Sequence, residues 1–90
     1  MDPKRDYSKG VIIIHNAIIA ELERKGIHGT VSDHTQGSGP LVPDTIFTVV
    51  ANGQTEEMKF NYEEIVDSVT NGIVTLARSK VRDLVSRFNA

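Results

Sequence analysis

The sequence predicts a small α+β domain in the order α-β-β-β-α, with two helices on one face of a three-stranded antiparallel sheet. Apolar residues recur with the helical period near both ends of the chain, and a strand pair joined by Asn52-Gly53 lies between them. Two amphipathic helices bury their apolar stripes most simply against one face of such a sheet. Ninety residues make one domain, so residues 1–90 are expected to fold as a single unit.

The first helix is expected over Lys9–Lys25, after a charged segment, residues 1–7, that we expect to form a loose tail. Ser8 is a suitable N-cap, because its hydroxyl can accept a hydrogen bond from a free backbone N–H of the first turn. Gly26 is placed to end the helix in the left-handed conformation, with Ile27 following as the apolar residue of a Schellman motif. Both ends of the predicted helix therefore carry recognisable signals.

Apolar residues surround the first turns of this helix almost completely, which predicts burial on more than one side. The competing interpretation of Val11–Ile14 is a strand, since β-branched residues favour sheets, but the two helix caps favour the helix. His15 lies in the middle of the apolar stripe. We interpret it as a core histidine that is hydrogen-bonded to a backbone or side-chain group, and a pH-sensitive switch or a catalytic base is the alternative.

The centre of the chain predicts the sheet. Ile27–Ser32 is a strand candidate, and residues 33–44 are rich in turn-forming residues and are expected to form a mobile surface loop. Thr45–Ala51 and Gln54–Phe60 flank Asn52-Gly53, which is the preferred dipeptide of a type I′ hairpin. These two segments are therefore expected to pair as antiparallel neighbours.

The hairpin also predicts which residues face the core. Turns of two or four residues both place the same four side chains on one face, because side chains alternate along a strand. These four are Phe47, Val49, Met58 and Phe60. Ile46 and Val50 then fall on the opposite face, where they are either covered by another element or exposed at an interface.

The last segment is expected to form one long amphipathic helix, from an N-cap at Asn61, with Glu64 completing a capping box, to Phe88. Unbroken, this helix would be roughly 40 Å long at about 1.5 Å per residue, whereas a domain of this size is roughly 30 Å across. Its apolar stripe also drifts around the helix. We therefore expect a bend or a break near Asn71-Gly72, a pair that can stop a helix.

Composition limits the classes of function. The chain has no cysteine, no run of about 20 apolar residues, and a charged N-terminus without the apolar stretch of a signal peptide, so we expect a soluble cytoplasmic protein without membrane association. The net charge is −2, from 10 basic and 12 acidic residues, which argues against a protein that neutralises many phosphates.

Nucleic-acid binding is the alternative function, because four cations gather near the C-terminus: Arg78, Lys80, Arg82 and Arg87. The predicted order matches the αβββα topology of double-stranded RNA-binding domains, which need basic side chains where the last helix begins. Here that place is occupied by Asn61-Tyr62-Glu63-Glu64, which would repel phosphate. Topology alone does not carry function, and we expect nucleic acid to be an unlikely partner of this chain.

No catalytic, cofactor or metal site is expected, so we interpret the protein as non-enzymatic. His28, Asp33 and His34 have a ligand chemistry that suits zinc, but their spacing matches no established site. Glu63 and Asp67 lie one turn apart on an outward helix face, where carboxylates keep ordinary pKa values and do not serve as acid–base pairs. The glycine-containing loop also lacks the lysine of a phosphate-binding loop.

The leading hypothesis is a protein-interaction module that associates with itself, as a homodimer or with another protein partner. Its basis is an excess of apolar surface over what two helices and one small sheet bury, including the outward Ile46 and Val50. We expect the C-terminal part of the last helix to make the partner contact. The residues predicted for this contact are Val81, Leu84, Val85 and Phe88.

Overall fold

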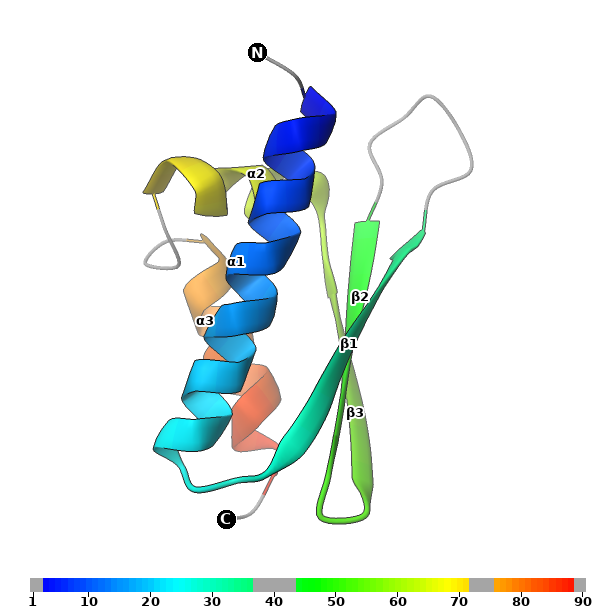
Figure 1. The fold of residues 1–90 in the computed structure, drawn as a ribbon, viewed down its shortest axis with the longest axis vertical. Helices are drawn as coiled ribbons and strands as arrows, with labels where there is room; N and C mark the ends of the chain where they lie inside the picture. Colours follow the sequence, from blue (N-terminus) through cyan, green and yellow to red (C-terminus); the bar gives the residue numbers. More distant parts are fainter. Residues whose placement is uncertain (1–2, 37–43, 72–75, 89–90) are drawn as a thin grey trace.

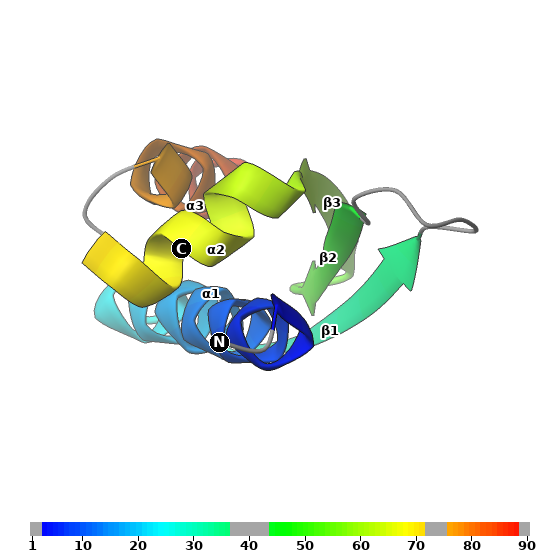
Figure 2. The ribbon, with the colours of Figure 1, turned by 90° about the horizontal axis from the view of Figure 1, so that it is seen from above.

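The computed structural model describes residues 3–36, 44–71 and 76–88 of the chain. The strands form one antiparallel sheet in the order β1-β2-β3, and the helices cover one of its faces (Figures 1 and 2). The predicted α+β class and the predicted order are confirmed, with two helices where one was expected after the strands. The elements are α1 (Pro3–Arg24), β1 (Gly29–Gln36), β2 (Asp44–Ala51), β3 (Gln54–Phe60), α2 (Tyr62–Asn71) and α3 (Leu76–Ser86).

Helix α1 begins at Pro3, six residues before the expected start at Lys9, so the segment from residue 3 to residue 7 is helical and does not form a loose tail. Proline suits the first turn of a helix, because its fixed φ matches the helix and its missing N–H is not needed there. Tyr7 then anchors this end. Its ring stacks on Tyr62 with a centroid separation of 5.8 Å, and its hydroxyl forms a hydrogen bond with the Thr45 hydroxyl.

The C-terminal end of α1 is the predicted Schellman motif. Gly26 has a φ of 73°, a left-handed conformation that glycine adopts without a steric cost. The Ile27 N–H donates to the Leu22 carbonyl oxygen at 2.9 Å, and the Gly26 N–H donates to the Glu23 carbonyl oxygen at 2.9 Å. Ile27 and Leu22 are both buried, so the apolar contact of this motif is also present.

The β2–β3 hairpin has a two-residue turn, one of the two turn lengths that the sequence left open. Asn52 and Gly53 have φ values of 54° and 76°, and the register pairs Phe47 with Met58. Phe47 and Phe60 are fully buried and meet edge to face, with their ring centroids 5.3 Å apart. The predicted core face of the hairpin is therefore confirmed.

Strand β1 runs from Gly29 to Gln36 and extends beyond the predicted Ile27–Ser32, so the segment from Asp33 to Gln36 is a strand where a loop was expected. Each of its eight residues has a partner in β2, from Gly29 opposite Ala51 to Gln36 opposite Asp44. The polar composition of this segment is typical of a loop, so the sequence did not predict the strand. Its strand conformation comes from pairing with β2. Residues 37–43 of the predicted loop lie outside the described residues.

The last segment, for which a long helix with a bend or a break was expected from Asn61 to Phe88, contains two described helices, α2 and α3. Helix α2 lies across one end of the helical layer, whereas α3 runs beside α1 (Figures 1 and 2). The two directions agree with the drift of the apolar stripe, since one straight helix could not bury both patches. Residues 72–75 lie outside the described residues, so the expected bend or break at Asn71-Gly72 stays a prediction.

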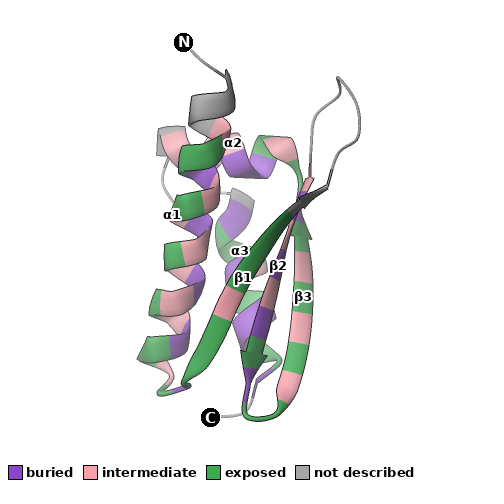
Figure 3. Ribbon diagram, turned by 45° about the vertical axis from the view of Figure 1, so that its right-hand side comes forward, coloured by how far each residue is buried: buried purple, intermediate pink, exposed green. Residues whose placement is uncertain are grey.

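The core lies between the helices and the sheet, as the distribution of buried residues in Figure 3 shows. Helices α1 and α2 approach each other very closely at Gly10, where an added Cβ would lie 2.1 Å from the Ile65 carbonyl oxygen. Only glycine allows this backbone contact. In the described part of the chain, no helix is long and apolar enough to cross a membrane.

Candidate functional site

The two outer edges of the sheet differ in how their backbone groups are covered. The Asn52-Gly53 turn makes Ala51 and Gln54 a hydrogen-bonded pair, and such pairs alternate along an antiparallel ladder. Residues 55, 57 and 59 of β3 therefore point their N–H and C=O groups away from β2, toward the edge. By the same alternation, residues 29, 31, 33 and 35 of β1 point theirs outward at the opposite edge.

Two cationic side chains cover part of the β3 edge, Lys80 of α3 and Arg87, which directly follows α3. Lys80 Nζ donates to the Lys59 carbonyl oxygen at 2.9 Å, and Arg87 Nη1 donates to the Glu57 carbonyl oxygen at 3.4 Å. In return, Gln54 Nε2 donates to the Arg87 carbonyl oxygen at 2.8 Å. Two of the three outward carbonyl groups of β3, those of Glu57 and Lys59, thus have partners within the chain. Covering an edge in this way is one means by which proteins prevent an edge strand from pairing further.

Lys80 is held in this position by a buried carboxylate. Its Nζ lies 2.8 Å from Glu64 Oε1 and 5.4 Å from the centroid of the Phe60 ring. Glu64 is only 8 % exposed, and the same Oε1 accepts a hydrogen bond from the Asn61 N–H at 2.9 Å, while Asn61 Oδ1 accepts one from the Glu64 N–H at 2.9 Å. The predicted capping box is confirmed, and it also fixes the lysine that covers the β3 edge.

The β1 edge has no such cover among the residues that the structure describes. No described side chain or strand is hydrogen-bonded to its outward groups, and the residues from Gly29 to His34 are exposed except for the half-buried Val31. An edge of this kind can pair with another extended strand. It is the largest set of uncovered backbone donors and acceptors in the described sheet.

Apolar side chains of α1 lie beside this edge. Helix α1 and β1 share one flank of the molecule, while α3 and β3 share the opposite flank (Figure 2). Ile12 is 59 % exposed, and Ile19, which lies on nearly the same side two turns later, is half-buried. His15 joins the two elements, because its Nδ1 lies 3.5 Å from Asp33 Oδ1. The histidine is thus half-buried at the flank and is not enclosed in the core.

The structure places the four predicted partner residues inside the chain's own core. Val81, Leu84, Val85 and Phe88 are each at most 4 % exposed. They pack there because α3 turns its apolar stripe toward α1 and β3. The prediction that they contact a partner is therefore corrected, since buried side chains are not available at the surface of this fold.

The sheet face opposite the helices carries Ile46 and Val50, as predicted. Ile46 is half-buried and Val50 is 44 % exposed. Around them lie Thr48 and Glu57, whose side chains are joined by a 3.3 Å hydrogen bond, and the charged side chain of Lys59. This face is mixed in polarity, so its apolar part is small.

The four cations near the C-terminus divide into two pairs. Lys80 and Arg87 are held by protein groups, and Arg87 also lies 3.5 Å from Glu56 and 3.1 Å from Asp83. Arg78 and Arg82 are exposed and make no hydrogen bond or salt bridge with any residue that the structure describes. The predicted patch of four is therefore split, and half of it has a structural role.

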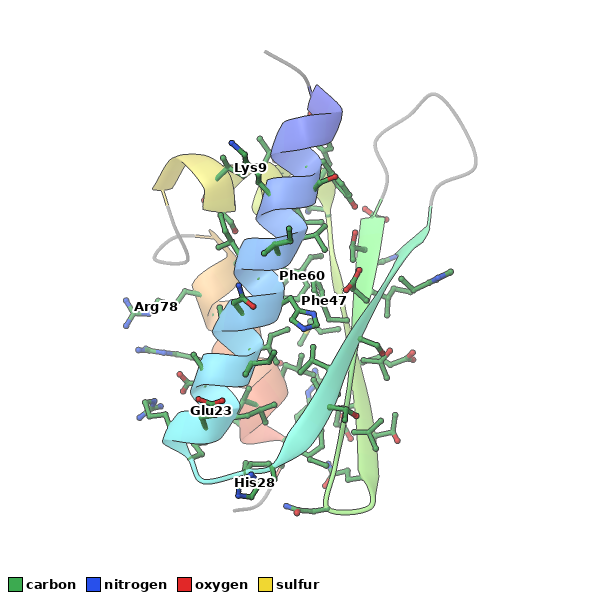
Figure 4. All side chains as sticks on the ribbon, viewed as in Figure 1. Lys9, Glu23, His28, Phe47, Phe60 and Arg78 are labelled. Atoms are coloured by element: carbon green, nitrogen blue, oxygen red, sulfur yellow. The ribbon has the colours of Figure 1, made fainter. Side chains whose placement is uncertain are left out.

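Arg78 and Arg82 border a groove of about 360 Å³ between α1 and α3. Figure 4 shows Arg78 extending outward from α3, away from the sheet. Across the groove, Arg24 is bonded to Glu21. This hydrogen bond lowers the pKa of Glu21, with further help from the charges of Arg24, Arg82 and Lys25, while burial opposes the shift. The groove is lined by Ala17, Ala20, Glu21, Arg24, Arg78, Val81 and Arg82.

The sequence did not indicate this groove. Its residues come from two helices that are more than fifty positions apart in the chain, and none of them belongs to a motif. The only local signal was that Arg78 and Arg82 share one side of a helix. Their proximity to Arg24 depends on how α1 and α3 pack, which periodicity does not specify.

The structure does not bring together the residues that could have formed a metal site or an acid–base pair. Asp33 and His34 lie on opposite faces of β1, because neighbouring strand residues alternate. Among the described residues, no group of three or more His, Cys, Asp or Glu side chains is placed to hold a metal ion. Glu64, which lies next to Glu63 in the chain, is buried and bonded to Lys80.

Comparison with known proteins adds no assignment to these surfaces. No protein-family model matches the chain, and neither does any curated protein or any solved structure. Its function has to be argued from the residues and contacts described above.

Proposed function

We propose that the protein is a small non-enzymatic interaction module that associates with a second copy of itself through the free edge of β1. The observation that carries this proposal is the difference between the two sheet edges. Lys80 and Arg87 cover two outward carbonyl groups at the β3 edge, whereas no described residue covers the β1 edge. An uncovered edge of eight residues provides the donors and acceptors that a second strand needs.

The sequence of β1 allows antiparallel self-pairing about a two-fold axis at Ser32. In that register the outward-bonding residues meet each other, and Val31 of one copy faces Asp33 of the other. Ser32 meets its own copy and Thr30 meets His34, so no like charges stand directly opposite. The two sheets would then join into one sheet of six strands, with all helices on the same face.

Helix α1 supports the same contact. It lies beside β1, so joining two β1 edges brings the α1 helices of the two copies to the same flank (Figure 2). Ile12 and Ile19 would lose exposed apolar surface there, at about 25 cal/mol for each Å² removed from water. The proposal thus keeps the predicted self-association through helices and moves its contact from α3 to α1.

The small size of the domain favours such an association. A chain of 90 residues buries a modest share of its surface on folding, so a dimer contact adds stability that the single core does not supply. The absence of cysteine fits a reducing compartment, and we propose the cytoplasm. Nucleic-acid binding by the C-terminal end is less favoured, because Lys80 and Arg87 are engaged within the chain.

Sedimentation velocity of the purified chain tests this proposal. We expect a dimer at about 100 μM that dissociates on dilution. Val31→Pro should give a monomer, because it removes an outward N–H without removing a bond to β2. Ile12→Glu should weaken the dimer, because it places a charge in the contact. Circular dichroism should show that both variants remain folded.

Val50→Glu is the matched control, because Val50 is a similarly exposed apolar residue on the other sheet face. It should leave the dimer intact. A wild-type chain that stays monomeric at about 100 μM would refute the proposal. A dimer that is broken by Val50→Glu but not by Val31→Pro would refute it too, because the contact would then lie on the outer face of the sheet.

A further inference from the structure

We infer that the groove between α1 and α3 is a docking site for an acidic amphipathic helix of a protein partner. The groove combines an apolar floor, made by Ala17, Ala20 and Val81, with a rim of arginines. It lies on the side of α1 that faces α3, away from the β1 edge (Figures 2 and 4). This inference goes beyond self-association and does not depend on it.

The net charge of the groove indicates the sign of the charge that its ligand carries. Arg24, Arg78 and Arg82 together with Glu21 leave a net charge of +2 at the rim. Arg24 already has its carboxylate partner in Glu21, whereas Arg78 and Arg82 have no salt-bridge partner among the described residues. The hydrogen bond from Arg24 lowers the pKa of Glu21 below its ordinary value, which agrees with a direct pairing of these two side chains. In the described part of the chain, neither guanidinium group on α3 makes a hydrogen bond or a salt bridge, although the charge of Arg82 helps to lower the pKa of Glu21, and both groups can therefore bind an anion.

Their spacing fits two carboxylates on a helix. Arg78 and Arg82 lie one turn apart on α3, and residues four apart on a helix have side chains about 6 Å apart. A partner helix with two acidic residues one turn apart presents carboxylates at the same spacing. Arginine pairs with a carboxylate through two parallel N–H···O bonds, which makes it well suited to such an interface.

The floor of the groove favours a helix over a bare anion. The small side chains of Ala17 and Ala20 let an apolar side chain of the partner approach the α1 backbone. From Ala17 to Arg24 the groove follows about two helical turns, or roughly 10 Å at about 1.5 Å per residue. An apolar side chain set between the two acidic residues would fill this space, as in other helix-in-groove contacts.

A nucleic acid fits these observations less well. Phosphate binding gains from a long basic track, and the cations that could extend this one, Lys80 and Arg87, are directed toward the β3 edge. The net charge of −2 also opposes the approach of a polyanion. A short basic rim around an apolar floor is more complementary to a compact surface that carries both acidic and apolar side chains than to a nucleic acid.

The test is a titration of the ¹⁵N-labelled full chain with a designed helical peptide that carries two glutamates one turn apart and a leucine between them. A second peptide has glutamines in place of both glutamates. We expect the first peptide to shift the backbone amides of Ala20, Arg78 and Arg82. The double variant Arg78→Gln/Arg82→Gln should weaken this binding at least about five-fold, because two exposed ion pairs are lost.

Lys9→Gln is the matched control, because it removes one exposed cation at the far end of α1 and should leave the affinity unchanged. The inference is overturned if the acidic peptide shifts no groove amide at about 1 mM. It is also overturned if the glutamine peptide binds equally well, or if a short DNA duplex or inorganic phosphate shifts the same amides at lower concentration. Val31→Pro should bind the peptide like the wild type, which separates failure of this site from failure of self-association.

Discussion

The two edges of the sheet differ in whether other residues of the protein cover them. At β3, Lys80 of α3 and Arg87, which follows α3, donate to outward carbonyl groups, and the buried Glu64 holds the lysine in place. At β1, no described residue covers the outward groups, and an exposed isoleucine lies on the neighbouring helix. The backbone chemistry of both edges is the same. The C-terminal segment thus covers one edge, and we propose that association takes place at the other.

The largest effect on stability is expected from removing the lysine that covers the β3 edge. Lys80→Ala would leave the buried Glu64 carboxylate and the Lys59 carbonyl oxygen without their lysine partner. Removing one member of a buried pair costs up to 3–5 kcal/mol, and because Lys80 retains some contact with water we expect a loss of about 2 kcal/mol in the free energy of unfolding. Urea denaturation followed by circular dichroism measures this loss.

Arg78→Ala serves as the comparison for that variant, because Arg78 lies on the same helix but has no partner among the described residues. Its effect should stay within about 0.5 kcal/mol. Equal effects of the two substitutions would contradict the distinction between a lysine that closes the edge and an arginine that is free.

A second prediction compares the two edges directly by amide hydrogen exchange. In dilute protein, the outward amides of Val31 and Asp33 should exchange quickly, whereas those of Ser32 and His34 are bonded to β2 and should exchange slowly. At concentrations where the dimer forms, exchange at Val31 and Asp33 should slow about ten-fold or more. The outward amides of β3 should not respond to concentration. If exchange slowed with concentration at β3 but not at β1, the contact would lie at the β3 edge, and our assignment of the uncovered edge would be wrong.

The smallest effect is expected at the groove, where Glu21 and Arg24 are bonded near the surface. The folded-state pKa of Glu21 lies below its ordinary value of 4.5, chiefly because of the hydrogen bond from Arg24. Its contribution to stability is therefore present above that ordinary value and is lost as the pH falls through the folded-state pKa. The melting temperature of the wild type should exceed that of Glu21→Gln at pH 7, and the difference should narrow on acidification to about pH 3. A difference that widens on acidification would contradict this sign.

The features that the sequence predicted correctly depend on residues close together in the chain. Asn52-Gly53 forms the hairpin turn, Gly26 and Ile27 end α1, and Asn61 with Glu64 begins α2. Each of these is a motif of two to six residues whose backbone preference is satisfied locally. The core face of the hairpin was predicted because turns of two and of four residues give the same face.

The features that the sequence did not predict depend on contacts between distant residues. β1 continues to Gln36 because β2 pairs with it, although its own composition resembles a loop. Val81 and Phe88 are apolar in either role, so periodicity alone did not distinguish a core contact from a partner contact. The same limit applied to the cations. Lys80 and Arg82 lie on the same helix, and only the packing of α3 determines which part of the fold each side chain faces.

By itself, then, the sequence determined the class of the fold, the hairpin and its core face, and the caps that begin α2 and end α1, because these follow from local backbone preferences and side-chain alternation. Only the tertiary structure decided which sheet edge is covered, which arginines have no salt-bridge partner among the described residues, and that α3 belongs to the core. Those outcomes depend on how α1, α3 and the sheet pack together, and hydrogen bonds between segments that are distant in the chain determine them.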